Sequence, residues 1–179
     1  ENILDLNIKL NKGAYSRTIQ KFQSYAKALE LASDVKLQNR LIGLLGETHT
    51  YQALLVVAPY MDNQPNAASA ASAVRTIVSK NIGTLGGEQI RAMLNKAITC
   101  FEAVGDADAG YAIDDIKSML EKLPAVETSP KFELSPEEAK DGFEVLFDGE
   151  DMSKWVGNTI DYVPMNGAIC VSAKYGNGG

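Results

Sequence analysis

The side chains that carry out acid–base, nucleophilic or metal chemistry are few in this sequence and widely spaced. It contains one histidine, His49, and two cysteines, Cys100 and Cys170. A structural zinc site takes four ligands, mostly Cys and His, and a catalytic triad needs a histidine beside its nucleophile. We therefore expect His49 to cap a helix or to face solvent, and both cysteines to be buried free thiols. We predict no metal, no cofactor and no catalytic residue in this chain.

Two pairs of carboxylates and a glycine-rich run also have structural interpretations. Asp114–Asp115 and Glu137–Glu138 are neighbours in the chain, and adjacent side chains on a helix point in different directions. We interpret both pairs as solvated helix faces. The Gly-Asn-Gly-Gly run at 176–179 lacks the lysine and the hydroxyl residue of a phosphate-binding loop, so a turn between strands is expected there.

Three residues in the C-terminal part form a candidate carbohydrate site: Trp155, Asp148 and Asp151. The face of the tryptophan ring suits the C–H side of a pyranose, and the two carboxylates would belong to a polar site beside it. A structural interpretation competes with each of these roles. The aspartates are suited to holding a turn after a strand, which we favour, and the tryptophan is suited to packing between sheets.

Composition and charge exclude two classes of partner. The chain has 179 residues, 45% of them hydrophobic, which is typical of a globular protein with a core of its own. Its formal net charge of -6 argues against nucleic acid and against an acidic membrane surface, because both require concentrated positive charge. Since no apolar run approaches the roughly 20 residues of a membrane span, we expect none.

The elements that must position these residues are mainly helices. Between residues 15 and 123, apolar residues recur at helical spacing, separated by short polar or glycine-containing breaks. Ser33 and Asp34 provide a natural start for one helix, and Gly46 an end. The six predicted helices cover about 16–32, 34–46, 49–61, 65–80, 87–103 and 108–122.

The order of these segments resembles HEAT repeats. In that family a leucine-rich helix ends in Leu-Gly, a second carries Leu and Pro and ends in Leu-Asp, and an alanine-rich helix opens the next repeat. Residues 39–48, 53–62 and 67–77 resemble these three helices in this order. The resemblance implies a mainly α fold, a right-handed helical-repeat array of about six helices. Because the turns are unequally spaced, tetratricopeptide-like or unclassified helical pairs remain alternatives.

The pattern changes after residue 123. Three prolines among polar residues at 124–142 are typical of a linker, within which Ser135 and Pro136 predict a short helical turn over 136–141. Apolar alternation predicts a strand over 143–147, followed by a turn. A second strand is expected over 168–171, after the turn pair Asn166–Gly167.

The run from Leu134 to Trp155 is similar to the opening of the 3-keto-disaccharide hydrolase family. It contains a Pro-Glu-Glu turn, a Gly-Phe pair, Leu-Phe-Asp-Gly at 146–149 and then Trp155; Tyr162, residues 166–169 and residues 176–179 fit the strands that follow. The resemblance implies a concanavalin-like jelly roll that binds or acts on sugars, and a periplasmic or extracellular location. A two-sheet sandwich takes about 100 residues, so 143–179 is expected to be its truncated start.

These observations predict three parts: a helical-repeat domain at 1–123, a linker at 124–142, and the β segment at 143–179. The expected function is a non-catalytic scaffold or interaction region of a secreted carbohydrate-processing protein. One alternative is that the parent protein is an active hydrolase of glycosidic bonds and this chain a piece of it. Another is a pure protein–protein interaction scaffold. Expected partners are a protein, the rest of the sugar-active domain, or carbohydrate, and the exposed C-terminal strands could pair with a second copy.

Overall fold

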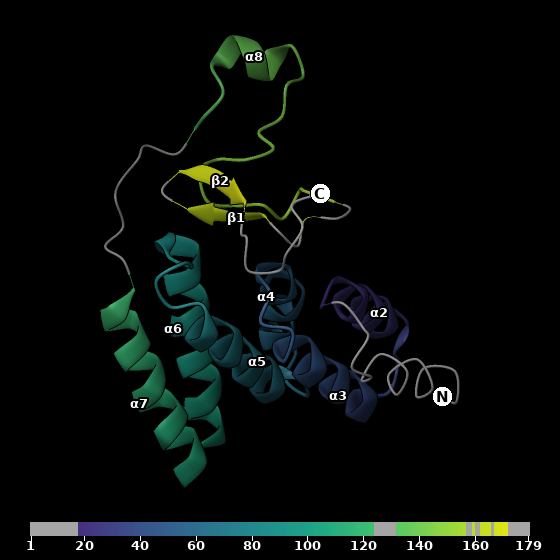
Figure 1. Cartoon of the computed structure of the whole chain (residues 1–179), viewed down its shortest axis with the longest axis vertical. Coiled ribbons are helices and arrows are strands. Elements are labelled where there is room, and N and C mark those ends of the chain that lie inside the picture. Colours follow the sequence, from purple (N-terminus) through teal and green to yellow (C-terminus); the bar gives the residue numbers. More distant parts are fainter. Residues whose placement is uncertain (1–17, 124–131, 157–158, 160–161, 166, 172–179) are drawn as a thin grey trace.

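The protein is mainly helical, with a short two-stranded antiparallel sheet near the C-terminus (Figure 1). The computed structural model describes residues 18–123, 132–156, 159, 162–165 and 167–171. The predicted turn at 176–179 and the first part of the predicted linker lie outside these residues. None of the described helices is both long and apolar enough to cross a membrane.

All six predicted helical segments are present. Local sequence explains where the second and the sixth begin, because an aspartate side chain accepts a hydrogen bond from a backbone N–H group of the first turn. Asp34 bonds to the N–H of Leu37, and Asp106 bonds to the N–H of Ala109. The helices are α2 (Thr18–Leu31), α3 (Val35–Gly46), α4 (Tyr51–Val57) with the 3-10 helix η1 (Ala58–Asp62), α5 (Ala67–Lys80), α6 (Gly87–Val104) and α7 (Ala107–Lys122).

The third segment differs in detail from the expected continuous helix. His49 has a φ of 54°, a left-handed conformation that ends the turn after α3, and α4 then begins after Thr50, whose Oγ1 accepts from the N–H of Ala53. Pro59 has no N–H to donate to an α-helical hydrogen bond, and the chain continues past it as the 3-10 helix η1.

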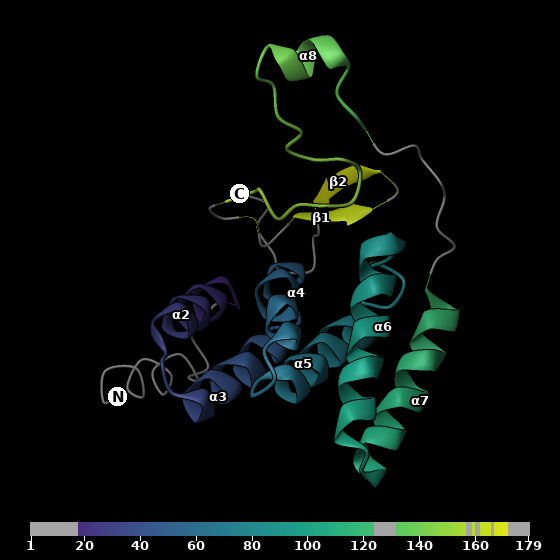
Figure 2. The ribbon, with the colours of Figure 1, turned by 180° about the vertical axis from the view of Figure 1, so that it is seen from behind.

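The helices pack in sequence order around one core. Pairs of neighbours lie against each other from α2 to α7, and α5 in the middle contacts α3, α4, η1, α6 and α7 (Figures 1 and 2). Where α3 meets α5, Gly46 lets the two backbones come close, since a Cβ at this position would lie 3.1 Å from Ala73. The centre is apolar; fully buried side chains include Leu41, Leu45, Leu54, Ile77 and Leu94.

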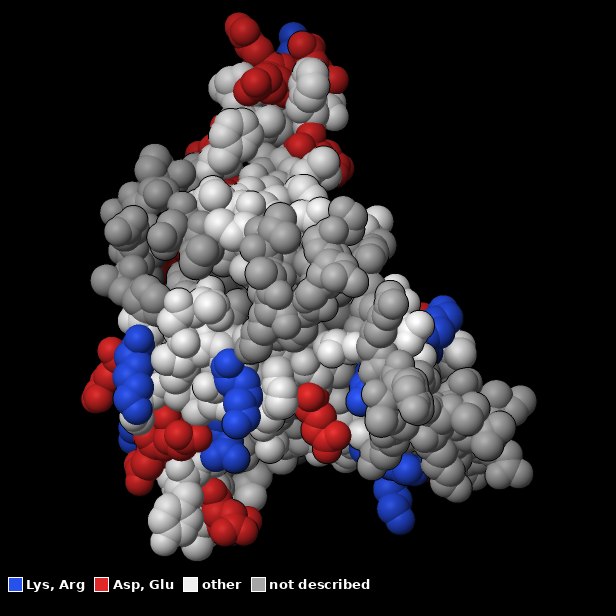
Figure 3. Space-filling view, in the orientation of Figure 1, with Lys and Arg blue, Asp and Glu red and all other residues white. Residues whose placement is uncertain are grey.

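The C-terminal part holds one short helix and one hairpin. The predicted turn of helix is present as α8 (Pro136–Lys140), with both hydrogen bonds of a capping box between Ser135 and Glu138. The predicted strand at 168–171 is confirmed as β2 (Ala168–Val171), which pairs antiparallel with β1 (Tyr162–Met165). Figure 3 shows acidic side chains gathered at the α8 end and both charge signs interspersed over the helices.

The predicted strand at 143–147 is wrong. A strand needs a neighbouring strand to bond to its backbone groups, and the described chain provides none here. Two backbone carbonyls of this segment accept hydrogen bonds from side chains instead. Lys154 donates to the carbonyl of Val145 (2.9 Å), and the indole N–H of Trp155 donates to that of Leu146 (3.0 Å). The segment therefore runs as an irregular loop, with Phe143 exposed to solvent.

Candidate functional site

The two candidate aspartates lie in one loop, residues 148–153, which we call the docking loop. Asp148 Oδ1 accepts from the backbone N–H groups of Glu150 (2.9 Å) and Asp151 (2.8 Å). Asp151 accepts from the N–H and the hydroxyl of Ser153, at 2.8 and 2.9 Å. Both carboxylates thus hold the turn, the role that sequence favoured.

The structure brings all three predicted site residues near one small hollow. Asp148, Asp151 and Lys154 line a depression of about 190 Å³ together with the chain from Val145 to Phe147. Trp155 does not line it but is tied to its wall through the Leu146 carbonyl. The indole is 40% exposed and lies outside the β1–β2 sheet, so it does not pack between sheets here.

The docking loop caps the N-terminal end of α6. Glu150 Oε1 accepts from the backbone N–H of Glu88 (3.0 Å), placing a carboxylate at the positive end of the helix dipole. Gly87 allows this approach in two ways: its φ of 88° suits glycine, and a Cβ there would lie 2.9 Å from Glu150 Oε1. Gln89 in the same turn donates to Asp151 Oδ1 at 3.4 Å.

Helix α4 provides the other side of the contact. The Tyr51 hydroxyl donates to Gln89 Oε1 (2.8 Å) and lies 3.4 Å from the Glu150 carbonyl. Gln52, only 6% exposed, donates from Nε2 to the carbonyls of Thr159 and Tyr162, the latter at 3.0 Å. One buried glutamine therefore links a helix to the start of β1.

Met152 adds an apolar anchor to these polar bonds. Its side chain is 2% exposed and belongs to the same buried cluster as the helical core, and Phe147, Tyr162 and Ile169 pack against that cluster from the C-terminal part. The contact between the two parts is thus an extension of the core with hydrogen bonds at its edge.

The environment of Tyr51 suppresses its ionisation. Burial raises the pKa of its hydroxyl far above the ordinary tyrosine value, and the negative charge of Asp151 raises it further. The tyrosine stays neutral over the physiological range, which keeps its O–H available as a hydrogen-bond donor.

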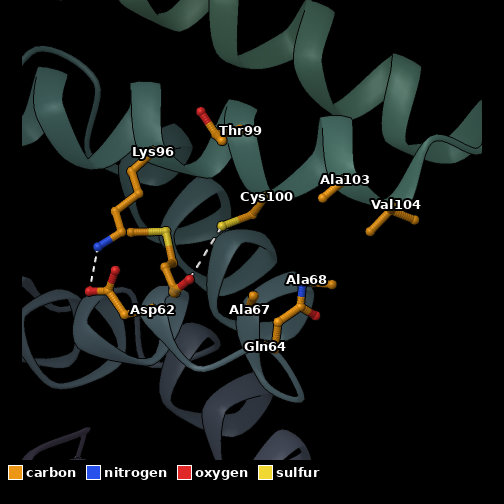
Figure 4. Close-up of a pocket in the computed structure, with 10 residues that line it drawn as sticks. Asp62, Gln64, Ala67, Ala68, Lys96, Thr99, Cys100, Ala103 and Val104 are labelled. Carbon is orange, nitrogen blue, oxygen red and sulfur yellow. Dashed lines mark hydrogen bonds and ion pairs between the residues drawn. The ribbon is translucent and has the colours of Figure 1, made fainter.

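A second concave feature, which we call the α6 groove, runs between α6 and the η1–α5 connection (Figure 4). Its volume is about 390 Å³, and small or apolar residues, among them Met61, Ala67 and Ala103, make much of its lining. Lys96 forms an ion pair with Asp62 across it (2.5 Å). A neighbouring hollow that shares Met61 and Lys96 reaches Asp151 and Ser153, so the groove leads to the docking loop.

The other predicted chemistry-bearing residues occupy structural positions. His49 is half-buried in the α3–α4 turn, and its carbonyl accepts from Asn81. Asp115 bonds to Arg75 (3.2 Å). Cys100 and Cys170 are free, as expected, but half-buried rather than buried, and burial raises the pKa of the Cys100 thiol. Within the described ranges, no group of His, Cys, Asp and Glu side chains is arranged to hold a metal ion.

Sequence reasoning missed the residues that join the two parts. Tyr51, Gln52 and Gln89 look like ordinary helical positions, and Glu150 looks like another surface acid. A weak signal was available at Met152, a large apolar residue in an otherwise polar stretch. Comparison with protein-family models, curated proteins and solved structures found no match to this chain.

Proposed function

We propose that the helical part is a non-catalytic platform that holds and orients the C-terminal β segment of a carbohydrate-processing protein. The contact of the docking loop with α4 and α6 carries this proposal. A flexible tether would need none of the buried Met152, the Glu150 cap or the Gln52 bonds. Their combination of apolar and polar contacts is typical of a fixed interface between two parts of one protein.

The helix packing supports the finer proposal that this platform is a HEAT-like array. Three successive pairs are α2 with α3, α4–η1 with α5, and α6 with α7. The second members contact one another from α3 to α5 and from α5 to α7, while α2 contacts α4 and η1 contacts α6. Stacking of pairs in two layers is how solenoid proteins bury their helix faces.

The carbohydrate role rests on the resemblance of residues 134–155 to the 3-keto-disaccharide hydrolases and on the hollow beside Trp155. In this proposal the β segment is the start of a jelly roll, and the parent protein is exported. Trp155 would stack on a sugar ring while Lys154 and the docking-loop carboxylates border the hollow.

The platform is tested by shortening its apolar anchor. Met152→Ala is expected to lower the free energy of unfolding by about 2–5 kcal/mol, because it leaves a cavity at the contact. Amide exchange of β1 and β2 should accelerate in the same variant. Val156→Ala is the control, since Val156 is 90% exposed in the same segment and its loss should change stability by less than about 0.5 kcal/mol. Equal, small effects of the two changes would contradict the proposal.

Carbohydrate binding can be followed through the only tryptophan. Titration with disaccharides and 3-keto-disaccharides is expected to change Trp155 fluorescence, and Trp155→Phe should retain stacking while Trp155→Ala loses the heat of binding in calorimetry. Failure of every sugar to bind would remove the carbohydrate role but leave the platform standing. Appreciable hydrolysis of glycosides by the 179-residue chain would instead overturn the non-catalytic assignment.

The α6 groove favours a second candidate, a surface that binds a protein segment. Its volume of about 390 Å³ and its many small side chains suit a short protein segment, as in other helical-repeat proteins. Selection from a displayed peptide library against the chain is the test, with Ala103→Arg to fill the groove. Selected peptides should lose at least tenfold in affinity for this variant and keep their affinity for Thr76→Arg on α5. Equal binding to both would exclude the groove.

A further inference from the structure

The β1–β2 hairpin has two edges, and the pairing register defines which backbone groups point outward. Met165 pairs with Ala168 across a two-residue turn that contains Gly167, with a φ of 75°. The closing pair of such a turn exchanges hydrogen bonds, and hydrogen-bonded and non-bonded pairs alternate along an antiparallel ladder. Val163 and Cys170 therefore bond to each other, whereas the next pairs direct their N–H and C=O groups away from the ladder. These outward residues are Tyr162 and Pro164 on β1 and Ile169 and Val171 on β2.

The outer edge of β1 is closed. Pro164 has no N–H, so this edge lacks a donor at its centre. The N–H of Tyr162 donates to the carbonyl of Thr159 (3.0 Å), and the carbonyl of Tyr162 accepts from Gln52 (3.0 Å). No further strand can add to β1 without breaking these bonds.

The outer edge of β2 has no strand partner among the described residues. Within the part of the chain that the structure describes, no hydrogen bond outside the ladder reaches the backbone of Ile169 or Val171. The strand reads Ala-Ile-Cys-Val, with high strand propensity and no charge. Proteins that keep an edge unpaired place lysine, proline or a bulge on it, and β2 has none of these. Its composition is that of a strand that is paired on both sides.

The geometry points to a second copy of this chain as the occupant, added antiparallel along β2 with a two-fold axis at Cys170. An antiparallel edge is complementary to itself, because Ile169 of one chain then bonds to Val171 of the other and the reverse. Cys170 of one chain then lies opposite Cys170 of the second copy. This pair exchanges no backbone hydrogen bonds, and in such pairs the Cα atoms lie about 4.5 Å apart. This inference does not rest on the carbohydrate role, and it is an alternative to the jelly roll proposed above, because a following strand of that fold would occupy the same edge.

The closed edge of β1 determines the size of the assembly. Among the described residues each copy offers one unpaired strand edge, so strand pairing is expected to stop at a four-stranded sheet across two chains. Five large apolar side chains of the preceding segment are also exposed: Phe132, Phe143, Leu146, Trp155 and Val156. A four-residue edge is small compared with a standard interface, so a weak, concentration-dependent dimer is expected.

The test is cross-linking in a Cys100→Ser chain, in which Cys170 is the only thiol. Diamide takes two electrons and two protons from two Cys170 thiols, which join as one disulfide. A disulfide spans Cα distances of about 4.4–6.8 Å, so no backbone movement is needed. A covalent dimer should form at least tenfold faster than from a Cys170→Ser chain, whose only thiol is Cys100. Equal rates of dimer formation in the two chains would contradict the proposed pairing of Cys170 with Cys170 of the second copy.

Association itself is measured by sedimentation of the unmodified 179-residue chain over a concentration series. Cys170→Lys places two like charges opposite each other and should weaken the dimer at least tenfold. Thr99→Lys on α6 adds the same charge away from the hairpin and should leave the dimer intact. In amide exchange, the N–H groups of Ile169 and Val171 should become more protected as the concentration rises.

Two outcomes contradict the inference. The first is a chain that stays monomeric up to roughly 500 µM. The second is strong protection of the Ile169 and Val171 amides that does not depend on concentration, because that would mean that another segment of the same chain already covers β2. A variant that fails to fold is recognised from far-UV circular dichroism. In that event the cross-linking comparison, which uses only Cys→Ser changes, decides alone.

Discussion

Tyr51 is the residue on which the two parts of the molecule converge. Its ring is 2% exposed in the helical core, while its hydroxyl contacts Gln89 of α6 and the backbone of the docking loop. A hydroxyl buried in this way is stable only as a neutral donor, because a phenolate would lie beside Asp151 without solvent. The contribution of Tyr51 to the contact with the docking loop therefore depends on pH.

Replacing Tyr51 by Phe should change how stability depends on alkaline pH. The folded pKa of Tyr51 is raised, so its stabilising contribution is complete below the ordinary value of 10.0 and is lost as the pH rises above it. At pH 7 the variant should lose about 1 kcal/mol with the hydrogen bond. As the pH rises above 10, the free energies of unfolding of the two proteins, measured by urea denaturation, should approach each other.

The control for this prediction is Tyr111→Phe, because Tyr111 is 76% exposed and should give a curve parallel to that of the unmodified protein. Some alkaline loss will persist in Tyr51→Phe, since burial also raises the pKa of Tyr25. A constant difference between Tyr51→Phe and the unmodified chain from pH 7 to 11 would contradict the assigned role.

At the scale of elements, helix ends and helix contacts determine the fold. Among the described helices, four begin at a side chain that accepts a hydrogen bond from their own first turn, while α6 is capped from a loop far along the chain. At the start of α5, the side chain of Asn66 makes no cap; it is fully buried and bonds to Asn39 of α3 at 2.8 Å. Positions that look alike in sequence thus serve either the helix itself or its neighbour.

Two glycines of α3 should respond in opposite ways to alanine. At Gly43 a Cβ meets nothing within 4 Å, so Gly43→Ala should stabilise the protein by about 0.5–1 kcal/mol through helix propensity. At Gly46 the new methyl group would press on Ala73 of α5, and overpacking of this kind costs about 1–3 kcal/mol. Thermal or urea unfolding of the two variants is the measurement. Equal stabilisation would mean that α3 and α5 are not in close contact.

The N-terminal capping box of helix α8 should weaken in acid. The pKa of Glu138 is lowered, first by the hydrogen bond from the Ser135 backbone and then by that from its side chain. The stabilising contribution of a carboxylate with a lowered pKa is present above its ordinary value and is lost as the pH falls through the folded pKa. Chemical shifts of the Ser135 amide should follow this titration.

Ser135→Ala should move the titration of Glu138 back toward the usual glutamate range. Glu137→Gln, a change in the same turn at an exposed site outside the capping box, should leave that titration unchanged. An unshifted Glu138 titration in Ser135→Ala would show that the capping box does not form in solution.

The difference between local and distant partners explains how much the sequence could predict. Asp34, Asp106 and Ser135 bond within their own helices, and the predicted helices match the observed ones to within a few residues. The strand expected at 143–147 failed because strand formation requires a partner, which the local pattern cannot reveal. The docking of Glu150 on α6 was invisible for the same reason: its partner lies 62 residues away.

At the scale of the whole molecule, the docking contact should make the two parts unfold together. Trp155 reports on the C-terminal part and far-UV circular dichroism on the helices. Because Met152 and Gln52 bury groups from both parts in one contact, the two signals should give one coincident transition in urea. A fluorescence transition at clearly lower urea would show that the C-terminal part opens independently.

The contact of Gln52 with Tyr162 also has a consequence for the order of folding, since the two residues are 110 positions apart. Contacts between the helices join neighbours in the chain and close short loops, whereas this contact closes a very long loop and is expected to form late. During synthesis the helices emerge before the residues that dock on them. Until then, water must solvate Gln52 and the start of α6, and that face of the helical part remains uncovered.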